Sequence, residues 1–301
     1  MKFLDVSTTV LLVATVMGCS AGGLEVERAG AFRHLGRTQT HIRNDVILGG
    51  DAVSRTDTPL SEVGALDAEV AAPSSDLEGP GLDATVSGCP ADMAPVGDAC
   101  IDRFEAALEE QVDGVWTLAS PYLTVGDRDV RAVVAPGEPP QAYLSGLEAE
   151  AACLRAGKRL CTSSEWLLAC RGAAGRLYPY GDIYQPGACN DSYAGTHPVV
   201  DFFGTAEGIW DPAHMNDPGI NQQPGTLAPA GGFANCVTPE GVFDLHGNLH
   251  EWVSDPDGVF RGGFYADASL NGEGCTYDTT AHTQTYHDYS TGFRCCRDVT
   301  R

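Results

Sequence analysis

The sequence contains few positive charges. Its 301 residues include 18 Lys and Arg against 41 Asp and Glu, which gives a formal net charge of -23. A chain this acidic repels phosphate backbones and anionic lipid surfaces. We therefore exclude nucleic acid as a partner. We expect contact with a membrane only through a covalent anchor.

Long hydrophobic runs are also missing, except near the N-terminus. The run VSTTVLLVATVM follows Lys2 and is short for a membrane span. It predicts a signal peptide over residues 1–19. The segment VMGCS at its end resembles a bacterial lipobox, in which Cys19 becomes lipidated. We expect an extracytoplasmic protein held at a cell envelope membrane by this lipid, and ordinary secretion is the alternative.

No two cysteines have the CxxC spacing typical of zinc sites. The chain nevertheless contains 11 cysteines. Setting Cys19 aside for lipid leaves 11 − 1 = 10, an even number that can form five disulfides. So many cysteines in an exported chain favour a disulfide framework.

Aromatic residues are absent from the stretch TDTPLSEVGALDAEVAAPSSDLEGPGLDATVSG. This composition buries too little apolar surface to offset the entropy of ordering the chain. We expect residues 20–87 to be a flexible tether. Cysteine, Trp and Tyr become frequent from Cys89 onwards, which places a folded domain at residues 88–301.

Two helices are predicted by capping boxes, in which Ser or Thr is followed three residues later by Glu. Ser145 and Glu148 begin the helix in LSGLEAEAACLRAG, and Thr162 and Glu165 begin the helix in CTSSEWLLACRG. Each segment ends in a glycine that stops the helix. The buried face predicted for the second helix consists of Trp166, Leu167 and Leu168. The segments VFRGGFY and GFRCC predict short strands among long loops, so we expect an irregular α+β fold.

Several segments together resemble the formylglycine-generating enzyme, or sulfatase-modifying factor, family. They are CPADMAPVGDACIDRFEA, AACLRAGKRLCTSSEWLLACRG, YPYG, CND, GVFDLHGNLHEWVSD, FRGGFY and TGFRCC. Their order covers roughly residues 88–301. The combination is specific, although no single segment is. The resemblance implies a loop-rich α+β fold related to C-type lectins.

The resemblance also implies disulfide pairs. In the family, the Cys of the first helix pairs with the Cys after GFR, which implies Cys153–Cys295. In the family, the Cys closing the second helix pairs with a Cys about twenty residues before the Cys after GFR, which implies Cys170–Cys275. Local sequence suggests Cys89–Cys100. The pairing of the other four stays open, and the simplest solution is Cys161–Cys296 with Cys189–Cys236.

The family's reaction uses oxygen, and copper bound by two cysteines, to convert a substrate cysteine into formylglycine. Cu(I) prefers such thiolate ligands. The first of these cysteines lies four residues after the second Gly of RGG, where this chain has Asp267. The second position is Gly272. Cys275 is displaced by three positions from it and is expected in a disulfide, so the sequence argues against copper.

Other chemistry-bearing residues lie in the region that replaces the copper site. The pocket candidates are Asp267, His282 and His287, with Glu273 and Asp288 nearby. Carboxylates and imidazoles together bind metals or act as acid and base. The alternative is that these are solvated loop residues.

The spacing of His246, His250 and Glu251 suggests zinc at first sight. Zinc hydrolases, however, place the Glu between two His on one helix. Here Glu251 follows the second His, and Gly247 with the following Asn favours a turn. Zinc is therefore not expected, and both histidines are interpreted as bystanders.

Calcium suits this segment better, because it takes carboxylate and carbonyl oxygens from a looping backbone. The resemblance implies a structural calcium site with side-chain oxygens from Asp244 and Glu251 and backbone carbonyls from Gly247 and Leu249. A turn cap and a buried ion pair are the alternative roles for the two acids. A second family calcium site implies Asn190 and the carbonyl of Asp191.

Three function classes remain open. The first is a non-catalytic, calcium-stabilised binding or structural module whose ligand is a protein, a peptide or a glycan. The second is a sulfatase-modifying oxidase, or an enzyme with another reaction at the altered pocket. The third is a calcium-dependent, lectin-like carbohydrate binder, which rests on fold analogy alone. The missing cysteines at positions 267 and 272 favour the first.

Overall fold

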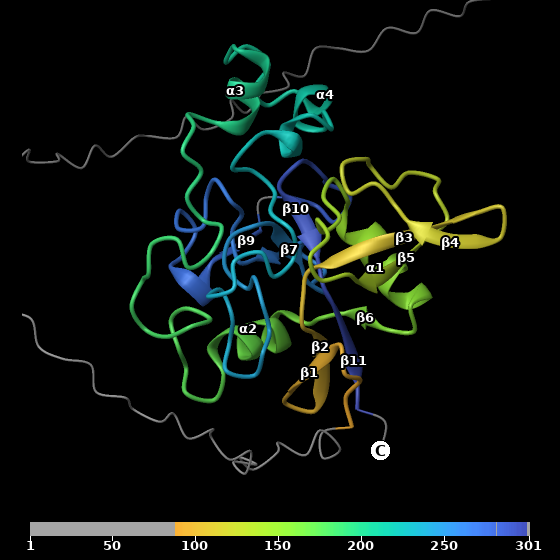
Figure 1. Ribbon diagram of the computed structural model, residues 1–301, viewed down its shortest axis with the longest axis vertical. Helices are drawn as coiled ribbons and strands as arrows, with labels where there is room; N and C mark the ends of the chain where they lie inside the picture. Colours follow the sequence, from red (N-terminus) through yellow and green to blue (C-terminus); the bar gives the residue numbers. More distant parts are fainter. Residues whose placement is uncertain (1–87, 281, 300–301) are drawn as a thin grey trace, which may run out of the picture. The chain divides into compact units, whose positions relative to one another are not determined.

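The computed structural model describes residues 88–280 and 282–299 (Figure 1). The predicted signal peptide, Cys19 and the predicted tether over residues 20–87 lie outside the described residues. No helix among the described residues is long and apolar enough to cross a membrane. The fold is α+β with short elements and long loops, as the sequence predicts.

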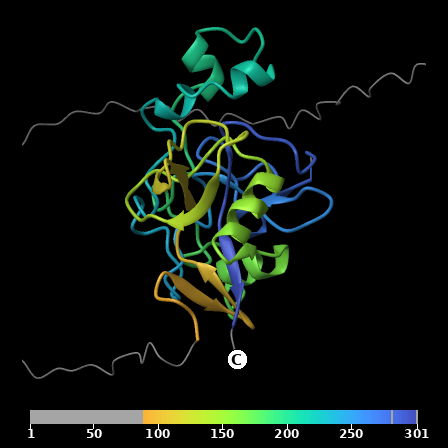
Figure 2. The ribbon, with the colours of Figure 1, turned by 90° about the vertical axis from the view of Figure 1, so that its right-hand side faces the viewer.

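The described part of the chain contains short helices of two kinds. The α-helices are α1 (Gly146–Arg155), α2 (Ser163–Arg171), α3 (Pro198–Phe203) and α4 (Pro212–Met215). The 3-10 helices are η1 (Ile220–Gln222) and η2 (Gly274–Thr276). In both views α3 and α4 lie close to each other and away from the sheets (Figures 1 and 2).

Both predicted capping boxes are present. The side chain of Ser145 accepts from the backbone N–H of Glu148, and the Glu148 carboxylate accepts in return from the backbone N–H of Ser145. Thr162 and Glu165 repeat the arrangement at α2. Each box satisfies two backbone donors that a helix start otherwise leaves without partners. Local sequence thus determines where α1 and α2 begin.

The strands form three small sheets. The first has the order β1-β2-β11-β6, from β1 (Met93–Val96), β2 (Ala99–Asp102), β11 (Cys295–Asp298) and β6 (Arg159–Leu160). The second has the order β10-β7-β8-β9, from β10 (Thr291–Phe293), β7 (His250–Trp252), β8 (Phe260–Arg261) and β9 (Asp278–Thr279). The third has the order β4-β3-β5, from β4 (Val115–Leu118), β3 (Ala106–Val112) and β5 (Val130–Val134).

Two details differ from the sequence prediction. The strand expected in VFRGGFY is only two residues long, because Gly262 and Gly263 adopt positive φ of 87° and 73° and turn the chain away. In α2, Trp166 is fully buried as expected, but Leu168 is 41% exposed. The helix buries Ala169 and Cys170 instead, because its Cys170 is tied to the core.

All ten cysteines in the described part of the chain form disulfides. The pairs are Cys89–Cys100, Cys153–Cys295, Cys161–Cys296, Cys170–Cys275 and Cys189–Cys236. They are the five pairs proposed from the sequence. Two of them tie β11 to the α1–α2 region, so the C-terminal strand is anchored in the centre of the domain. Disulfides in this number indicate an oxidising, extracytoplasmic environment.

Candidate functional site

The segment between Phe243 and β7 is a tight loop. Asp244, Gly247 and Asn248 adopt positive φ of 59°, 78° and 58°. A Cβ atom at Gly247 would lie 2.1 Å from the carbonyl oxygen of Asn190, so only glycine fits there. The loop therefore packs its backbone directly against the Asn190 segment, and no helix forms that could align His246 with His250.

Glu251 lies at the centre of a buried polar cluster. Its carboxylate accepts from Arg294 through both oxygens, with 2.6 Å from Nε to Oε2 and 2.6 Å from Nη2 to Oε1. The indole N–H of Trp166 donates to the same Oε2 at 2.8 Å. All three side chains are buried. The structure thus gives Glu251 the ion-pair role that was one alternative from the sequence.

Two further buried acids share this cluster. Burial, and then the nearby carboxylates of Asp244 and Glu251, raise the pKa of Glu105 well above its usual range. Burial also raises the pKa of Asp244 to about 6, against the hydrogen bond from the Gly231 N–H and the charge of Arg294. Three carboxyl groups therefore surround one guanidinium, and the cluster has an excess of negative charge when all of them ionise.

A calcium ion at this loop would need oxygen lone pairs that the other contacts of Asp244 and Glu251 leave over. Oδ2 of Asp244 accepts a hydrogen bond from the Gly231 N–H at 2.7 Å. Among the described residues, Oε1 of Glu251 accepts only from Arg294. Carboxylate oxygens have more than one acceptor site, so lone pairs remain. No group of three or more His, Cys, Asp or Glu side chains in the described part of the chain is arranged to hold a metal. Backbone carbonyls at Gly247 and Leu249 would have to complete such a site.

The residues of the second calcium candidate have different partners. The amide of Asn190 donates to the Thr226 carbonyl and to Asn248 Oδ1, at 2.9 Å each. The carboxylate of Asp191 faces His246 at 3.2 Å. Asn190 therefore joins its segment to the turn at Asn248, whereas the Asp191 side chain contacts His246.

Asp267 holds a turn together. Its Oδ1 accepts from the backbone N–H groups of Ser269 and Leu270 at 3.0 Å each, and its Oδ2 accepts from the Tyr277 hydroxyl at 3.0 Å. Gly272 supplies no side chain. Since all cysteines of the described residues are paired, the thiolate pair that copper requires is absent from these positions. The residues do not fit the family's copper site.

Asp267 and His282 line one cavity of about 500 Å³. Aromatic and imidazole rings dominate its wall, and the rings belong to Tyr193, His197, Trp210, His250, Phe260, Phe264, His282, Tyr286 and Tyr289. His287 does not share this cavity. Its Nδ1 lies 2.7 Å from Asn216 Oδ1, at a smaller depression beside α4. The structure therefore brings two of the three pocket candidates together. We call this space the aromatic cavity.

Burial lowers the pKa of all three histidines that line the aromatic cavity, His197, His250 and His282, and so favours their neutral forms. Burial lowers the pKa of His250 to about 3, and nearby His282 lowers it further. Burial also lowers the pKa of His282, although Asp288 opposes this. The His282 ring stacks on Tyr286 with centroids 3.6 Å apart. Neutral, stacked rings make a wall for an apolar or aromatic ligand and supply little positive charge.

Sequence reasoning missed the rim of the aromatic cavity. Trp210, between α3 and α4, is 70% exposed, and Leu270 is 84% exposed. Both line the opening of the cavity. Large apolar side chains at a cavity mouth are typical of surfaces that a partner covers. Nothing in the periodicity around Trp210 marks it, because it lies in an irregular loop.

Comparisons with known proteins agree with the resemblance. The chain matches the family model described as "Sulfatase-modifying factor enzyme 1-like domain" over residues 54–299. It is 32% identical over 176 residues to "Inactive C-alpha-formylglycine-generating enzyme 2" of Bos taurus, covering 54% of this chain and 51% of that protein. It is 31% identical over 190 residues to "Formylglycine-generating enzyme" of Streptomyces coelicolor, covering 53% of each.

The chain thus spans about half the length of these curated relatives. Among solved structures, it is similar to PvdO from Pseudomonas aeruginosa, with a TM-score of 0.42 and 14% identity over 66% of this chain and 80% of that one.

Proposed function

Because the chain belongs to the sulfatase-modifying factor enzyme 1-like family, we propose that it is a non-catalytic binding module built on that scaffold. One observation carries the proposal. The position of the first copper cysteine is Asp267, whose two oxygens hold a turn. The position of the second is Gly272, and the nearest cysteine, Cys275, is in a disulfide. The relative from Bos taurus named as inactive is consistent with this proposal.

The ligand that we propose is a peptide segment with an apolar side chain. The aromatic cavity provides rings on several sides, and exposed Trp210 and Leu270 extend the apolar surface beyond its mouth. Burying such side chains contributes about 25 cal/mol for each Å² of apolar surface removed from water. Calcium at Asp244 and Glu251 would stabilise the loop before β7, and β7 contributes His250 to the cavity wall.

A direct assay tests the absence of the oxidation reaction. The purified chain is incubated with copper, oxygen and a sulfatase-motif peptide, and the peptide is examined for aldehyde by mass spectrometry. We expect none. Aldehyde that disappears in Cys275→Ser would restore the enzyme interpretation. Aldehyde that persists in this variant would also contradict the proposal, and it would locate the chemistry elsewhere.

Selection of a phage-displayed peptide library tests the binding role. We expect enrichment of peptides with apolar residues, and loss of the enriched peptides' binding in Trp210→Ala. Trp116→Ala is the matched control, because Trp116 lies on β4 against Arg131 and does not line the aromatic cavity. Equal loss of peptide binding in both variants would count against the aromatic cavity as the binding site. A glycan array with and without calcium tests the carbohydrate alternative.

The export and anchoring of the chain are part of the same proposal. The disulfides favour an oxidising compartment, and the lipobox-like segment favours lipid attachment at Cys19. Mass spectrometry of the mature N-terminus should find a lipidated Cys19. A Cys19→Ser variant should lose the lipid and leave the membrane fraction. A mature chain that begins elsewhere, without lipid, would favour ordinary secretion.

A further inference from the structure

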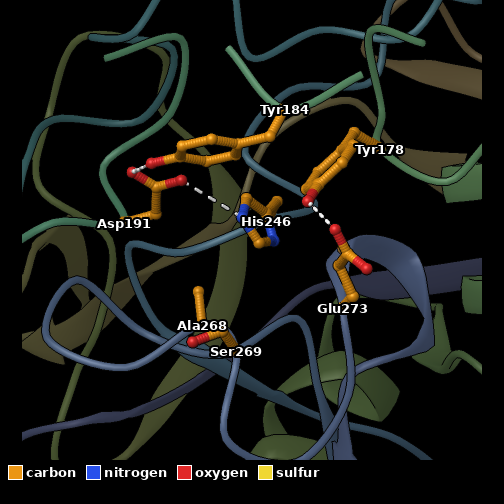
Figure 3. A pocket seen from close by; sticks show the side chains of 8 residues that line it. Tyr178, Tyr184, Asp191, His246, Ala268, Ser269 and Glu273 are labelled. Atoms are coloured by element: carbon orange, nitrogen blue, oxygen red, sulfur yellow. Dashed lines mark hydrogen bonds and ion pairs between the residues drawn. The ribbon is translucent and has the colours of Figure 1, made fainter. Parts of the chain in front are cut away.

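A second cavity, of about 520 Å³, lies on the other side of the loop that carries Asp267. Asp267 and Leu270 line the aromatic cavity, whereas Ala268 and Ser269 line this one. Its remaining wall is formed by Gly274 and by Tyr178, Tyr184, Asp191, His246 and Glu273. The last five are labelled in Figure 3. We call it the acidic cavity. Its wall includes His246 from the loop before β7 and Asp191 from the second calcium candidate, but neither Asp244 nor Glu251 nor Trp210 lines it.

An imidazole with an unused nitrogen belongs to this wall. His246 is 4% exposed, and its Nε2 lies 3.2 Å from Oδ2 of Asp191. In the neutral ring this contact places the proton on Nε2 and leaves a lone pair on Nδ1. Nδ1 is buried and has no hydrogen-bond partner among the described residues. The ring lies between the carboxylates of Asp191 and Glu273 (Figure 3), and Nδ1 is the ring nitrogen that is not bonded to Asp191.

Two tyrosines orient the two carboxylates. The Tyr178 hydroxyl donates to Glu273 Oε1 at 2.7 Å, and the Tyr184 hydroxyl donates to Asp191 Oδ1 at 3.3 Å. The rings of Tyr178 and Tyr184 are 5.7 Å apart, and Tyr178 meets His246 edge-on at 5.3 Å. Burial and the hydrogen-bonded carboxylate of Glu273 raise the pKa of Tyr178, so its hydroxyl keeps its proton and continues to donate. Tyr184 is 42% exposed and leaves the cavity open to solvent.

The wall of the acidic cavity therefore carries anionic side chains but, among the described residues, no Lys or Arg. The wall presents two carboxylates, a lone pair on His246 and aromatic faces. Such a wall complements a ligand that carries positive charge and several N–H donors.

We propose that the acidic cavity binds an organic cation, namely an alkylammonium or alkylguanidinium group. The carboxylates of Asp191 and Glu273 accept its N–H donors, and His246 Nδ1 accepts a further one. The tyrosine rings contact its face or its alkyl stem, since aromatic faces attract cations. The group is either that of a small amine or the tip of a Lys or Arg side chain on a peptide, because the two share this chemistry.

Isothermal titration calorimetry on the full chain tests the proposal. The probes are n-butylammonium, n-butylguanidinium and the neutral isostere n-butylurea. We expect binding of at least one cation and none of n-butylurea at equal concentration. A pentapeptide with a central Arg, compared with its citrulline counterpart, distinguishes the two sources. Tighter binding of the Arg peptide than of n-butylguanidinium indicates a peptide ligand, and equal binding indicates a small amine.

Charge-removing variants locate the binding. Glu273→Gln and Asp191→Asn keep the shape of each side chain, and each should weaken binding of the cation about tenfold or more, since one charge-assisted hydrogen bond becomes neutral. Asp127→Asn is the matched control, because Asp127 is exposed and lies outside the cavity. Its affinity should stay within twofold of the unmodified chain.

Three results would overturn the proposal. The first is no measurable binding of either cation at millimolar concentration. The second is binding of n-butylurea as tight as that of n-butylguanidinium. The third is equal affinity in Glu273→Gln and in the control. None of these results bears on the peptide selection at Trp210, so the two proposals fail independently.

Discussion

Arg294 donates two parallel hydrogen bonds of 2.6 Å to the Glu251 carboxylate, and both side chains are buried in the domain. Its remaining donors reach the carbonyls of Asp102 and Phe243 at 3.1 Å and 2.8 Å. Arg294 therefore joins β2, the loop before β7 and the C-terminal region through one side chain. A buried ion pair of this kind is costly to break, because the partner left behind keeps its desolvation penalty.

Replacing one partner should therefore destabilise the domain strongly. Glu251→Gln removes the charge and should lower the free energy of unfolding by about 3–5 kcal/mol. Urea denaturation with a chelator in every sample measures this without a contribution from calcium. The exposed pair between Arg155 and Asp129 is the control, and Asp129→Asn should cost under about 1 kcal/mol. Similar losses in both variants would mean that Arg294 finds other partners.

Removing calcium should lower the melting temperature if the loop before β7 holds the ion. A ligand that binds only the folded state stabilises it by mass action, so a chelator should remove that contribution. Asp244→Gly should make the melting temperature insensitive to chelator, because it deletes the side-chain oxygens while glycine keeps the positive φ of 59°.

Asp113→Gly is the matched control for this variant. Asp113 also has a positive φ, of 51°, but it lies exposed in the turn between β3 and β4. This variant should keep the full response to chelator. If the unmodified chain shows no change in midpoint when calcium is removed, the calcium proposal is wrong.

The disulfides should contribute to stability according to the loops that they close. Cys153–Cys295 spans 142 residues and Cys89–Cys100 spans 11. The chain-entropy relation gives roughly 5 kcal/mol for the long loop and roughly 3 kcal/mol for the short one. Replacing both cysteines of a pair by Ser, followed by chemical denaturation, tests this order. A larger loss for the 89–100 pair would show that contacts, and not loop closure, dominate.

Protonation of Glu165 should make the domain less stable in acid. Burial alone raises the pKa of this carboxyl, but hydrogen bonds from Arg159 and Thr162 outweigh it and hold the pKa below its usual value of 4.5. The folded state therefore favours the ionised form. Its contribution is complete above this value and is lost as the pH falls through the lowered pKa.

The measurement is the free energy of unfolding at several pH values from about 6 to about 3. Glu165→Gln should be less stable by about 1 kcal/mol or less at the upper end, because the pair with Arg159 is partly exposed. This difference should shrink towards the lower end. Glu138→Gln, at an exposed position, should show no such trend. A difference that grows in acid would contradict the assignment.

Sequence alone predicts features that depend on near neighbours or on a specific pattern. The capping boxes at Ser145 and Thr162 satisfy backbone donors within three residues, so they can be recognised without the fold. The sheet of β3, β4 and β5 was missed, because AALEEQV lacks β-branched residues and alternation along most of its length. Hydrogen bonding to β5 stabilises β3 as a strand, although the sequence of β3 does not indicate one.

In the candidate sites too, the sequence indicates which residues matter, but the roles of these residues depend on contacts with distant parts of the chain. Asp267 was identified by its distance from RGG, and its actual role in a turn depends on Tyr277, ten residues away. His246 was interpreted as a bystander, yet it faces Asp191 across 55 positions of sequence. No periodicity relates two loop residues at such a separation. The packing of Gly247 on the Asn190 carbonyl brings them together.

Gly272 should prove as informative as Asp267 about the position of the family's copper site. It has a positive φ of 132°, and a Cβ there would lie 2.7 Å from the Thr276 carbonyl oxygen. These are backbone contacts, so they cannot relax by a change of rotamer. Gly272→Ala should therefore cost more than about 2 kcal/mol in unfolding free energy, since both strain and overpacking oppose it.

Gly114→Ala separates these two causes. Gly114 also has a positive φ, of 81°, but nothing lies within 4 Å of its added Cβ. Strain alone should cost this variant about 1 kcal/mol. If denaturation shows equal losses at the two positions, the loop around Gly272 adapts to a side chain, and a cysteine could be restored there. If Gly272→Ala costs distinctly more, then the backbone itself excludes the second thiolate, and Asp267→Cys alone should not recreate a copper pair.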